Sequence, residues 1–201
     1  MIKLLIYKQV YETLTDSSFG GLPVRGDNEN FGWPTCRNCD GPMQFLGKIV
    51  VDNKIEQIFM CQNDPGVCED WDANDGGNKV LVTTSKELVF VQSPAEGVTT
   101  RETNYGVEIV NFKSKDYNEA RLAWAENNNK SPREVLGQLF GAPSWIQGDE
   151  TPVCDSCKKP MRFVVQLEQG PDWKTEMNFG GGCAYLFDCT CDSSAKFLWQ
   201  C

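Results

Sequence analysis

Histidine is absent from this sequence of 201 residues. Its absence excludes Ser-His-Asp and Cys-His catalysis, and it excludes a zinc centre with histidine ligands. A metal site in this chain has to be built from cysteine, carboxylate or carbonyl ligands. Asp and Glu are plentiful, but no pair of them stands out by position as a general acid and a general base. The sequence therefore predicts a protein that is not an enzyme.

The sequence also lacks a long apolar run. No stretch approaches the ~18 apolar residues that a membrane-spanning helix needs. The segment 1–7 is too short for the apolar region of a signal peptide, and no small-residue cleavage site follows it. We therefore predict a cytoplasmic protein without a membrane partner. Thiols stay reduced in that compartment, so closely spaced cysteines favour metal ligation over disulfide formation.

Positive charge is in deficit. The chain has 19 basic and 28 acidic residues, which gives a net charge of −9. Such a chain is a poor match for the phosphate backbone, so we expect no nucleic-acid partner. Acidity favours association with a basic protein, although it also serves solubility alone. The hydrophobic fraction of 40% and the aromatic fraction of 11% predict a folded core rather than disorder.

One motif occurs twice. The pattern P-x-C-x2-C-x2-P-M-x-F fills residues 34–45 and returns 118 residues later at 152–163. Two flanking similarities keep the same order: 19–23 with 140–143 (allowing one gap), and 58–61 with 186–189. We interpret the chain as an internal duplication. The first repeat is predicted at 1–115, and a helical link with the second repeat at 116–201, packed as one compact pseudo-symmetric unit.

The secondary-structure signals are mainly those of strands. β-branched and aromatic residues predict strands at 43–51, 56–61, 79–84, 87–92, 105–112, 161–168, 184–189 and 195–200. The Ala- and Glu-rich segment 117–127 predicts a helix. Ser131, Pro132 and Glu134 form a capping box that predicts a second helix, which Gly141 and Pro143 end. The expected fold class is α+β, with internally duplicated and mainly antiparallel β-sheet units, a few helices and Cys-rich turns.

Eight of the ten cysteines fall into four close pairs. A C-x2-C turn places two sulfurs on one side, and a second pair follows the strand expected beside it, which suits a tetrahedral ion. The predicted ligands are Cys36, Cys39, Cys61 and Cys68 for one site, and Cys154, Cys157, Cys189 and Cys191 for the other. All-thiolate sites favour zinc in a structural role, as one ion or two. The spacing Cys189-x-Cys191 is tight, so Cys183 or Cys201 could replace Cys191. Buried, metal-free thiols are the alternative to metal sites.

An acidic loop at 68–78 resembles a calcium loop only superficially. With Asp70 at the first ligand position, Asp75 stands where an EF-hand has glycine and Leu81 where it has glutamate. We instead predict a structured loop, in which Trp71 packs inward and Gly76 and Gly77 make a turn before the next strand. Its carboxylates could face a basic partner.

Taken together, these motifs resemble the bacterial YwqG-like family of uncharacterised-domain proteins. The matching segments cover nearly the whole chain in order: 19–23, 33–36, 39–46, 68–78, 143–147, 154–163, 166–167, 178–181 and 185–189. The resemblance implies a duplicated α+β fold without established catalytic chemistry. Members occur beside polymorphic toxins of contact-dependent and type VI secretion systems, where they resemble immunity proteins. The cysteine pattern is more distantly similar to eukaryotic programmed-cell-death-protein-two-like ribosome-assembly chaperones.

The leading hypothesis is therefore an immunity protein that binds a cognate toxin effector domain, such as a nuclease, and occludes its active site. An acidic inhibitor complements the basic groove of such a toxin. The candidate contacts are Asp27, Glu29, Glu69, Asp70, Asp72 and Asp75. Each of them alone could equally be a solvated loop carboxylate. The alternative hypothesis is a chaperone-like binder of a basic cellular protein, such as a ribosomal protein.

Overall fold

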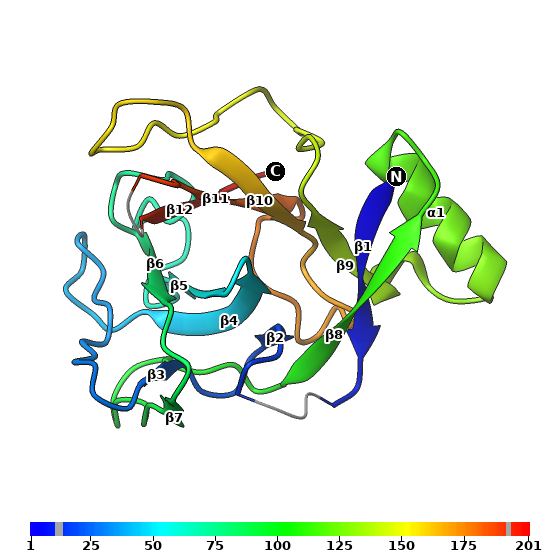
Figure 1. The fold of residues 1–201 in the computed structure, drawn as a ribbon. Helices are drawn as coiled ribbons and strands as arrows, with labels where there is room; N and C mark the ends of the chain where they lie inside the picture. Colours follow the sequence, from blue (N-terminus) through cyan, green and yellow to red (C-terminus); the bar gives the residue numbers. More distant parts are fainter. Residues whose placement is uncertain (11–13, 192–193) are drawn as a thin grey trace.

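The computed structural model describes residues 1–10, 14–191 and 194–201 (Figure 1). Ten strands form a single antiparallel sheet in the order β12-β11-β10-β9-β1-β8-β2-β4-β5-β6. These strands are β1 (Ile2–Lys8), β2 (Ser18–Phe19), β4 (Gln44–Val51), β5 (Lys54–Met60), β6 (Asn78–Thr83), β8 (Tyr105–Phe112), β9 (Val135–Leu139), β10 (Arg162–Leu167), β11 (Cys183–Asp188) and β12 (Ala195–Gln200). A separate ribbon pairs β3 (Val24–Gly26) with β7 (Leu88–Phe90).

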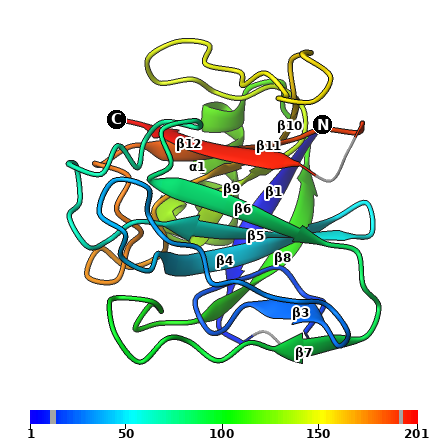
Figure 2. The same cartoon turned by 90° about the vertical axis from the view of Figure 1, so that its left-hand side faces the viewer.

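The large sheet curls into a nearly closed barrel. Its two edge strands, β6 and β12, come to lie against each other without joining the hydrogen-bonded ladder, as Figures 1 and 2 show. Inward-facing side chains from both parts of the chain meet inside, among them Leu5, Leu46, Val165 and Leu186, all with at most 1% of their surface exposed. Burial of this shared core is the main force that holds the ten strands together.

The predicted α+β fold class is wrong. Within the described residues, the structure is mostly antiparallel β and contains a single α-helix, α1 (Tyr117–Asn128). The second predicted helix is only the 3-10 turn η1 (Pro132–Glu134), in which Ser131 Oγ accepts a hydrogen bond from Arg133 N. Strand β9 follows directly.

Tertiary pairing explains why β9 is a strand. All five of its residues are buried, and it pairs with β1 on one side and β10 on the other. Gly137 allows this closeness, because a Cβ there would lie 1.9 Å from the backbone oxygen of Gln166. The local capping signal is therefore used only for one turn, and burial in the sheet overrides the helix propensity that follows it.

Helix α1 packs on the outer face of the sheet (Figure 1). Asp116 caps its first turn by accepting a hydrogen bond from Glu119 N, and Asn129 ends it in a left-handed conformation. Tyr117, Ala120 and Trp124 are buried against side chains of β1 and β9. No helix in the described ranges has the length and apolarity to span a membrane.

The two copies of the cysteine motif have equivalent local structures. A β-bulge interrupts the pairing of β4 with β5 between Phe45 and Gly47, and another interrupts β10 with β11 at the positions 118 residues later. The carbonyl of Leu46 accepts a hydrogen bond from Gly20 N, and that of Val164 accepts one from Phe140 N. Gly20 therefore corresponds structurally to Phe140, one residue away from the sequence match of Phe19 with Phe140.

The strands of 1–115 and 116–201 form one continuous sheet. Strand β1 pairs with β8 from the first segment and with β9 from the second. Strand β1 thus joins the strands of the two segments within the sheet. The division of the chain at residue 115 stays a prediction.

Candidate metal centres

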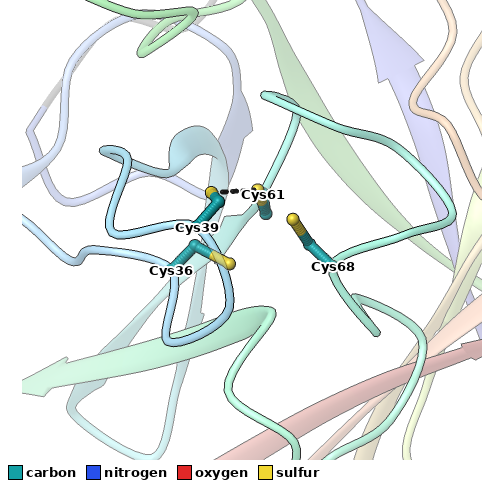
Figure 3. A group of neighbouring side chains, drawn as sticks. All are labelled: Cys36, Cys39, Cys61 and Cys68. Atoms are coloured by element: carbon teal, nitrogen blue, oxygen red, sulfur yellow. Dashed lines mark hydrogen bonds between the residues drawn. The ribbon is translucent and has the colours of Figure 1, made fainter.

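All eight predicted ligand cysteines come together in two groups. We call Cys36, Cys39, Cys61 and Cys68 the N-terminal tetrad, and Cys154, Cys157, Cys189 and Cys191 the C-terminal tetrad. Within each tetrad the sulfur atoms lie within 4.8 Å of one another. Figure 3 shows the N-terminal tetrad, whose sulfurs face a common centre. Among the described residues, only these two groups of Cys, Asp and Glu have a metal-binding arrangement. The acidic loop gathers no such group.

Each C-x2-C turn is held by the backbone. Cys36 N donates to Gly41 O at 2.8 Å, and Asp40 N donates to Cys36 O at 2.9 Å. An isolated bridge between Thr35 and Pro42 closes the turn. Asp40 has φ 57°, the left-handed conformation that the reversal requires.

The C-terminal turn repeats these contacts. Cys154 N donates to Lys159 O at 2.9 Å, and Lys158 N donates to Cys154 O at 3.0 Å. Val153 and Pro160 form the bridge, and Lys158 has φ 58°. Both turns thus present their sulfurs from the same preformed backbone.

The second pair of each tetrad is delivered by a hairpin. Cys61 directly follows β5, and its N–H donates to Gly77 O at 2.8 Å. Cys189 directly follows β11, and its N–H donates to Ser194 O at 3.0 Å. Because β4 pairs with β5 and β10 with β11, the end of each hairpin lies beside the turn that begins it.

The sulfur separations suit tetrahedral thiolate coordination. Cys39 and Cys61 are 3.7 Å apart, and the Cys154–Cys191 and Cys157–Cys189 pairs are each 3.6 Å apart. A tetrahedral zinc ion with Zn–S bonds of about 2.3 Å has S···S edges of about 3.8 Å. The Cys189–Cys191 edge is shorter, at 3.1 Å, as expected for the tight C-x-C spacing. Within the described residues, none of these eight cysteines forms a disulfide bond.

The tetrads differ in enclosure. Cys36, Cys61 and Cys68 are at most 2% exposed, and only Cys39 reaches the surface. In the C-terminal tetrad Cys191 is exposed and Cys157 is half-buried. A pocket of about 180 Å³ also opens beside the C-terminal tetrad, with Cys157, Cys189 and Cys191 in its wall. Solvent therefore has easier access to the C-terminal tetrad.

Polar groups surround the sulfurs in the manner of second-layer partners of metal ligands. Asn38 N lies 3.4 Å from Cys36 Sγ, and Asn63 Nδ2 lies 3.4 Å from Cys61 Sγ and 3.6 Å from Cys39 Sγ. In the C-terminal tetrad Cys154 Sγ is 3.8 Å from Ser194 Oγ. N–H and O–H donors of this kind spread the negative charge of bound thiolates.

Local environment shifts the thiol pKa values in opposite directions. Burial raises the pKa of Cys36 and of Cys68. The backbone N–H of Gly41 lowers the pKa of Cys39, and the backbone N–H of Cys157 lowers the pKa of Cys154 to about 6. In the metal-free state Cys36 and Cys68 thus hold their protons, and metal binding as thiolates releases them.

The two remaining cysteines lie outside the tetrads. Cys183 Sγ donates to Glu168 Oε1 at 3.5 Å, and burial raises the pKa of this thiol to about 12. Cys201 is exposed at the end of the chain. The structure therefore places Cys191, and neither alternative, with Cys154, Cys157 and Cys189.

The predicted partner-binding carboxylates do not share one environment. Asp27, Glu29, Glu69 and Asp75 are exposed and Asp72 is half-buried. Asp70 is fully buried and presents no surface to a partner, and the partner contacts stay predictions. Burial raises the pKa of Asp70, and neither of its carboxylate oxygens has a hydrogen-bond partner among the described residues. Trp71 is 40% exposed rather than packed inward.

An internal charge network was not marked by the sequence. Arg162 donates to Asp188 from Nε and Nη2, at 2.8 and 2.7 Å, and Lys54 Nζ lies 3.3 Å from the same carboxylate. Glu56 is fully buried, and neither of its oxygens has a hydrogen-bond partner among the described residues. Burial, and next the nearby Asp188, raise the pKa of Glu56 to about 8. The one available signal was that Glu56 lies on the same face of β5 as Ile58 and Met60, which is the inward face.

Comparison with protein-family models and with curated proteins finds no match for this chain. The geometry of the two tetrads is therefore the firmest guide to what the chain does.

Proposed function

We propose that the chain is a zinc-stabilised protein-binding module in which each tetrad holds one structural zinc ion. The observation that carries this proposal is the equivalent convergence of four cysteines at two sites. Four thiolates fill a tetrahedral shell and leave no position for a substrate, which is the arrangement of structural rather than catalytic zinc. Zinc is favoured over other ions because it binds soft thiolate ligands and, without redox chemistry, keeps one oxidation state.

Cobalt substitution tests the coordination directly. Refolding the protein in Co²⁺ gives the visible absorption of a tetrahedral tetrathiolate complex, and titration reaches an end point at two ions per chain. A Cys36→Ser/Cys39→Ser variant should halve the end point. A chain that stays folded and binds no Co²⁺ would show that the tetrads are metal-free thiol clusters.

We infer that the biological role of this module is that of an immunity protein for a basic toxin effector. Two features support the inference, the net charge of −9 and the exposed carboxylates Asp27, Glu29, Glu69 and Asp75. A toxin that acts on nucleic acid carries a positive groove, and an acidic inhibitor associates rapidly with it and covers it. A stable interface of this kind buries about 1,600 Å² in total.

The test has two stages. The tagged protein is used to isolate its partner from the lysate of its own cells, and the partner is identified by mass spectrometry. The isolated partner is then assayed alone and with one equivalent of the protein. Loss of toxin activity at 1:1 stoichiometry supports immunity. A ribosomal or other basic housekeeping protein as the stoichiometric partner supports the chaperone-like function instead, and no partner above background contradicts both.

A further inference from the structure

The edge strands β6 and β12 meet at a seam (Figure 2). A pocket lies beside this seam, lined by the loop that precedes β6 and by strand β12. It has a volume of about 490 Å³. We call it the seam pocket, and its walls are Trp71, Asp72, Ala73, Asn74, Glu150, Thr151, Pro152, Val153, Asp155, Lys196 and Leu198. No cysteine lines the pocket, but Asp155 in its wall lies within the second C-x2-C turn. The loop after Cys68 forms one wall, and the segment that leads into the second C-x2-C turn forms the other.

The seam pocket is negatively charged. Three carboxylates line it, those of Asp72, Glu150 and Asp155, against one cation, Lys196. The Lys196 ammonium is already bound, at 2.7 Å to Asn74 Oδ1, 3.0 Å to Val153 O and 3.1 Å to Asp155 Oδ2. Its side chain is only 13% exposed. Lys196 is therefore held by Asn74, Val153 and Asp155, and it forms no ion pair with the other two carboxylates.

Neither Asp72 nor Glu150 has an ion-pair partner within the described part of the chain. Asp72 Oδ1 accepts a hydrogen bond from Asn74 N at 2.6 Å, and Glu150 Oε2 accepts one from Gln200 Nε2 at 3.0 Å. These contacts hold the two carboxylates in place without neutralising them. Each carboxylate keeps a second oxygen for an incoming cation.

Trp71 adds a second kind of cation recognition. Its ring meets Trp199 edge-on, at 6.3 Å between centroids and 82° between planes, which holds the indole in position. The residue nevertheless remains 40% exposed at the wall of the pocket. Indole is the strongest aromatic partner for a cation, and the interaction gains strength where water is partly excluded.

The lining fits an organic cation better than a metal ion. The carboxylates of the pocket do not converge into a metal-binding group among the described residues. Apolar surface from Pro152, Val153 and Leu198 faces the same space, which suits the methylene stem of a long basic side chain. A planar guanidinium stacks flat on indole while its in-plane N–H groups donate to carboxylates, whereas an ammonium has no planar face to stack, so the lining favours a guanidinium.

We propose that the seam pocket receives an arginine side chain from the partner protein, with Trp71 against the guanidinium and Asp72 and Glu150 as its acceptors. The proposal rests on the protein-binding function proposed above and names the chemistry of one anchor in that interface. A buried arginine on aromatic and acidic neighbours is a frequent centre of binding energy in protein interfaces.

The first test uses a defined probe and needs no knowledge of the partner. Acetyl-Gly-Arg-Gly-amide is titrated into the ¹⁵N-labelled, zinc-loaded protein, and the indole and amide signals of Trp71 and the amide signals of Asp72–Asn74 are followed by NMR. The matched peptide carries citrulline, which has the shape of arginine without its charge. We expect saturable shifts with the arginine peptide, and binding of the citrulline peptide weaker by about tenfold or more.

A charge-matched pair of variants locates the effect. Asp72→Asn with Glu150→Gln keeps the acceptor oxygens that bind Asn74 and Gln200 and removes two charges; we expect binding about tenfold weaker. Glu108→Gln with Glu126→Gln removes two charges from exposed sites away from the pocket and should change binding less than about twofold. Equal binding of both peptides, or equal losses in both variants, contradicts the proposal.

Binding assays with the isolated partner distinguish a failure of the seam-pocket proposal from a failure of the proposed binding function. If the Trp71→Ala variant binds that partner as tightly as the wild type does, the seam pocket is not part of the interface and the binding function stands. If no partner is found, the binding function fails, and the peptide titration still reports whether the pocket recognises arginine.

Discussion

In both cysteine tetrads a C-x2-C turn supplies the first two ligands in the same way. The tetrads differ in how the second two ligands are delivered. In the N-terminal tetrad six residues separate Cys61 from Cys68, and this loop supplies Asn63, whose amide lies near two sulfurs. In the C-terminal tetrad only Thr190 separates Cys189 from Cys191, and Cys191 remains exposed. The turn is thus fixed by its own backbone hydrogen bonds, whereas the following loop decides how well the site is covered.

This difference predicts unequal contributions to stability. An enclosed site contributes the full energy of metal binding to folding, because its thiols are buried and poorly solvated when the metal is absent. An open site contributes less, since water can solvate its free thiols, and its ion exchanges faster.

Removal of the N-terminal turn ligands should have the largest effect. We expect Cys36→Ser with Cys39→Ser to lower the free energy of unfolding by about 5 kcal/mol or more, which corresponds to about 10–20 °C in Tm. Thermal unfolding followed by circular dichroism measures the change. If this variant lost less unfolding free energy than Cys154→Ser with Cys157→Ser does, the expected ranking of the two sites would be reversed.

Removal of the C-terminal turn ligands should have an intermediate effect. Cys154→Ser with Cys157→Ser is expected to lower the unfolding free energy by about 3 kcal/mol and to leave the other site loaded. The same thermal measurement, combined with the metal content of each variant, checks both statements. If this variant also loses the ion of the N-terminal tetrad, the two sites fold as one unit and the comparison between them fails.

Glu56, beside the charge network of Arg162, Asp188 and Lys54, should make stability depend on pH. Its pKa is about 8 in the folded chain and near 4.5 when unperturbed. Its stabilising contribution is therefore complete below about pH 4.5 and is lost as the pH rises through about 8. Asp188, Lys54 and Arg162 face it and set the residual charge. We expect the difference in unfolding free energy between Glu56→Gln and the wild type to favour the variant by about 2 kcal/mol more at about pH 8.5 than at about pH 5.

Urea unfolding of the zinc-loaded wild type and of the Glu56→Gln variant at the two pH values measures this difference. The cysteine ligands titrate equally in both proteins, so they cancel in the comparison. Parallel pH profiles would mean that Glu56 keeps its charge in the folded state.

The smallest effects are expected for the two cysteines outside the tetrads. Cys201→Ser should change the unfolding free energy by less than about 0.5 kcal/mol, because the residue is exposed. Cys183→Ser should keep the hydrogen bond to Glu168 and cost about 1 kcal/mol. Both variants should still bind two ions. A loss of metal in either would identify it as a ligand in place of Cys191.

Sequence reasoning predicted the tetrads because spacing and strand order are local signals. In the two tetrads the first and last cysteines are 32 and 37 residues apart in the sequence, and two consecutive strands tend to be neighbours. The strands near 43–51, 105–112 and 195–200 were visible for a similar reason, since each carries β-branched and aromatic residues.

The errors arose where tertiary context decides. The capping signal at Ser131 is real but serves a single turn, because the five residues that follow are buried between β1 and β10. Nothing in the run Ile2–Lys8 places it at the centre of the sheet. Asp70 reads as a surface carboxylate in an acidic loop, yet the fold buries it beside Trp199. Burial of a single side chain depends on the whole barrel and leaves no local pattern.

Native mass spectrometry of the zinc-loaded protein and of the two double variants tests the metal proposal most directly. We predict two zinc ions in the wild type, one in each double variant, and earlier loss of the C-terminal ion when a chelator is added. A folded wild-type chain that carries no zinc after purification in its presence would contradict the proposal, and the tetrads would then be buried thiol clusters.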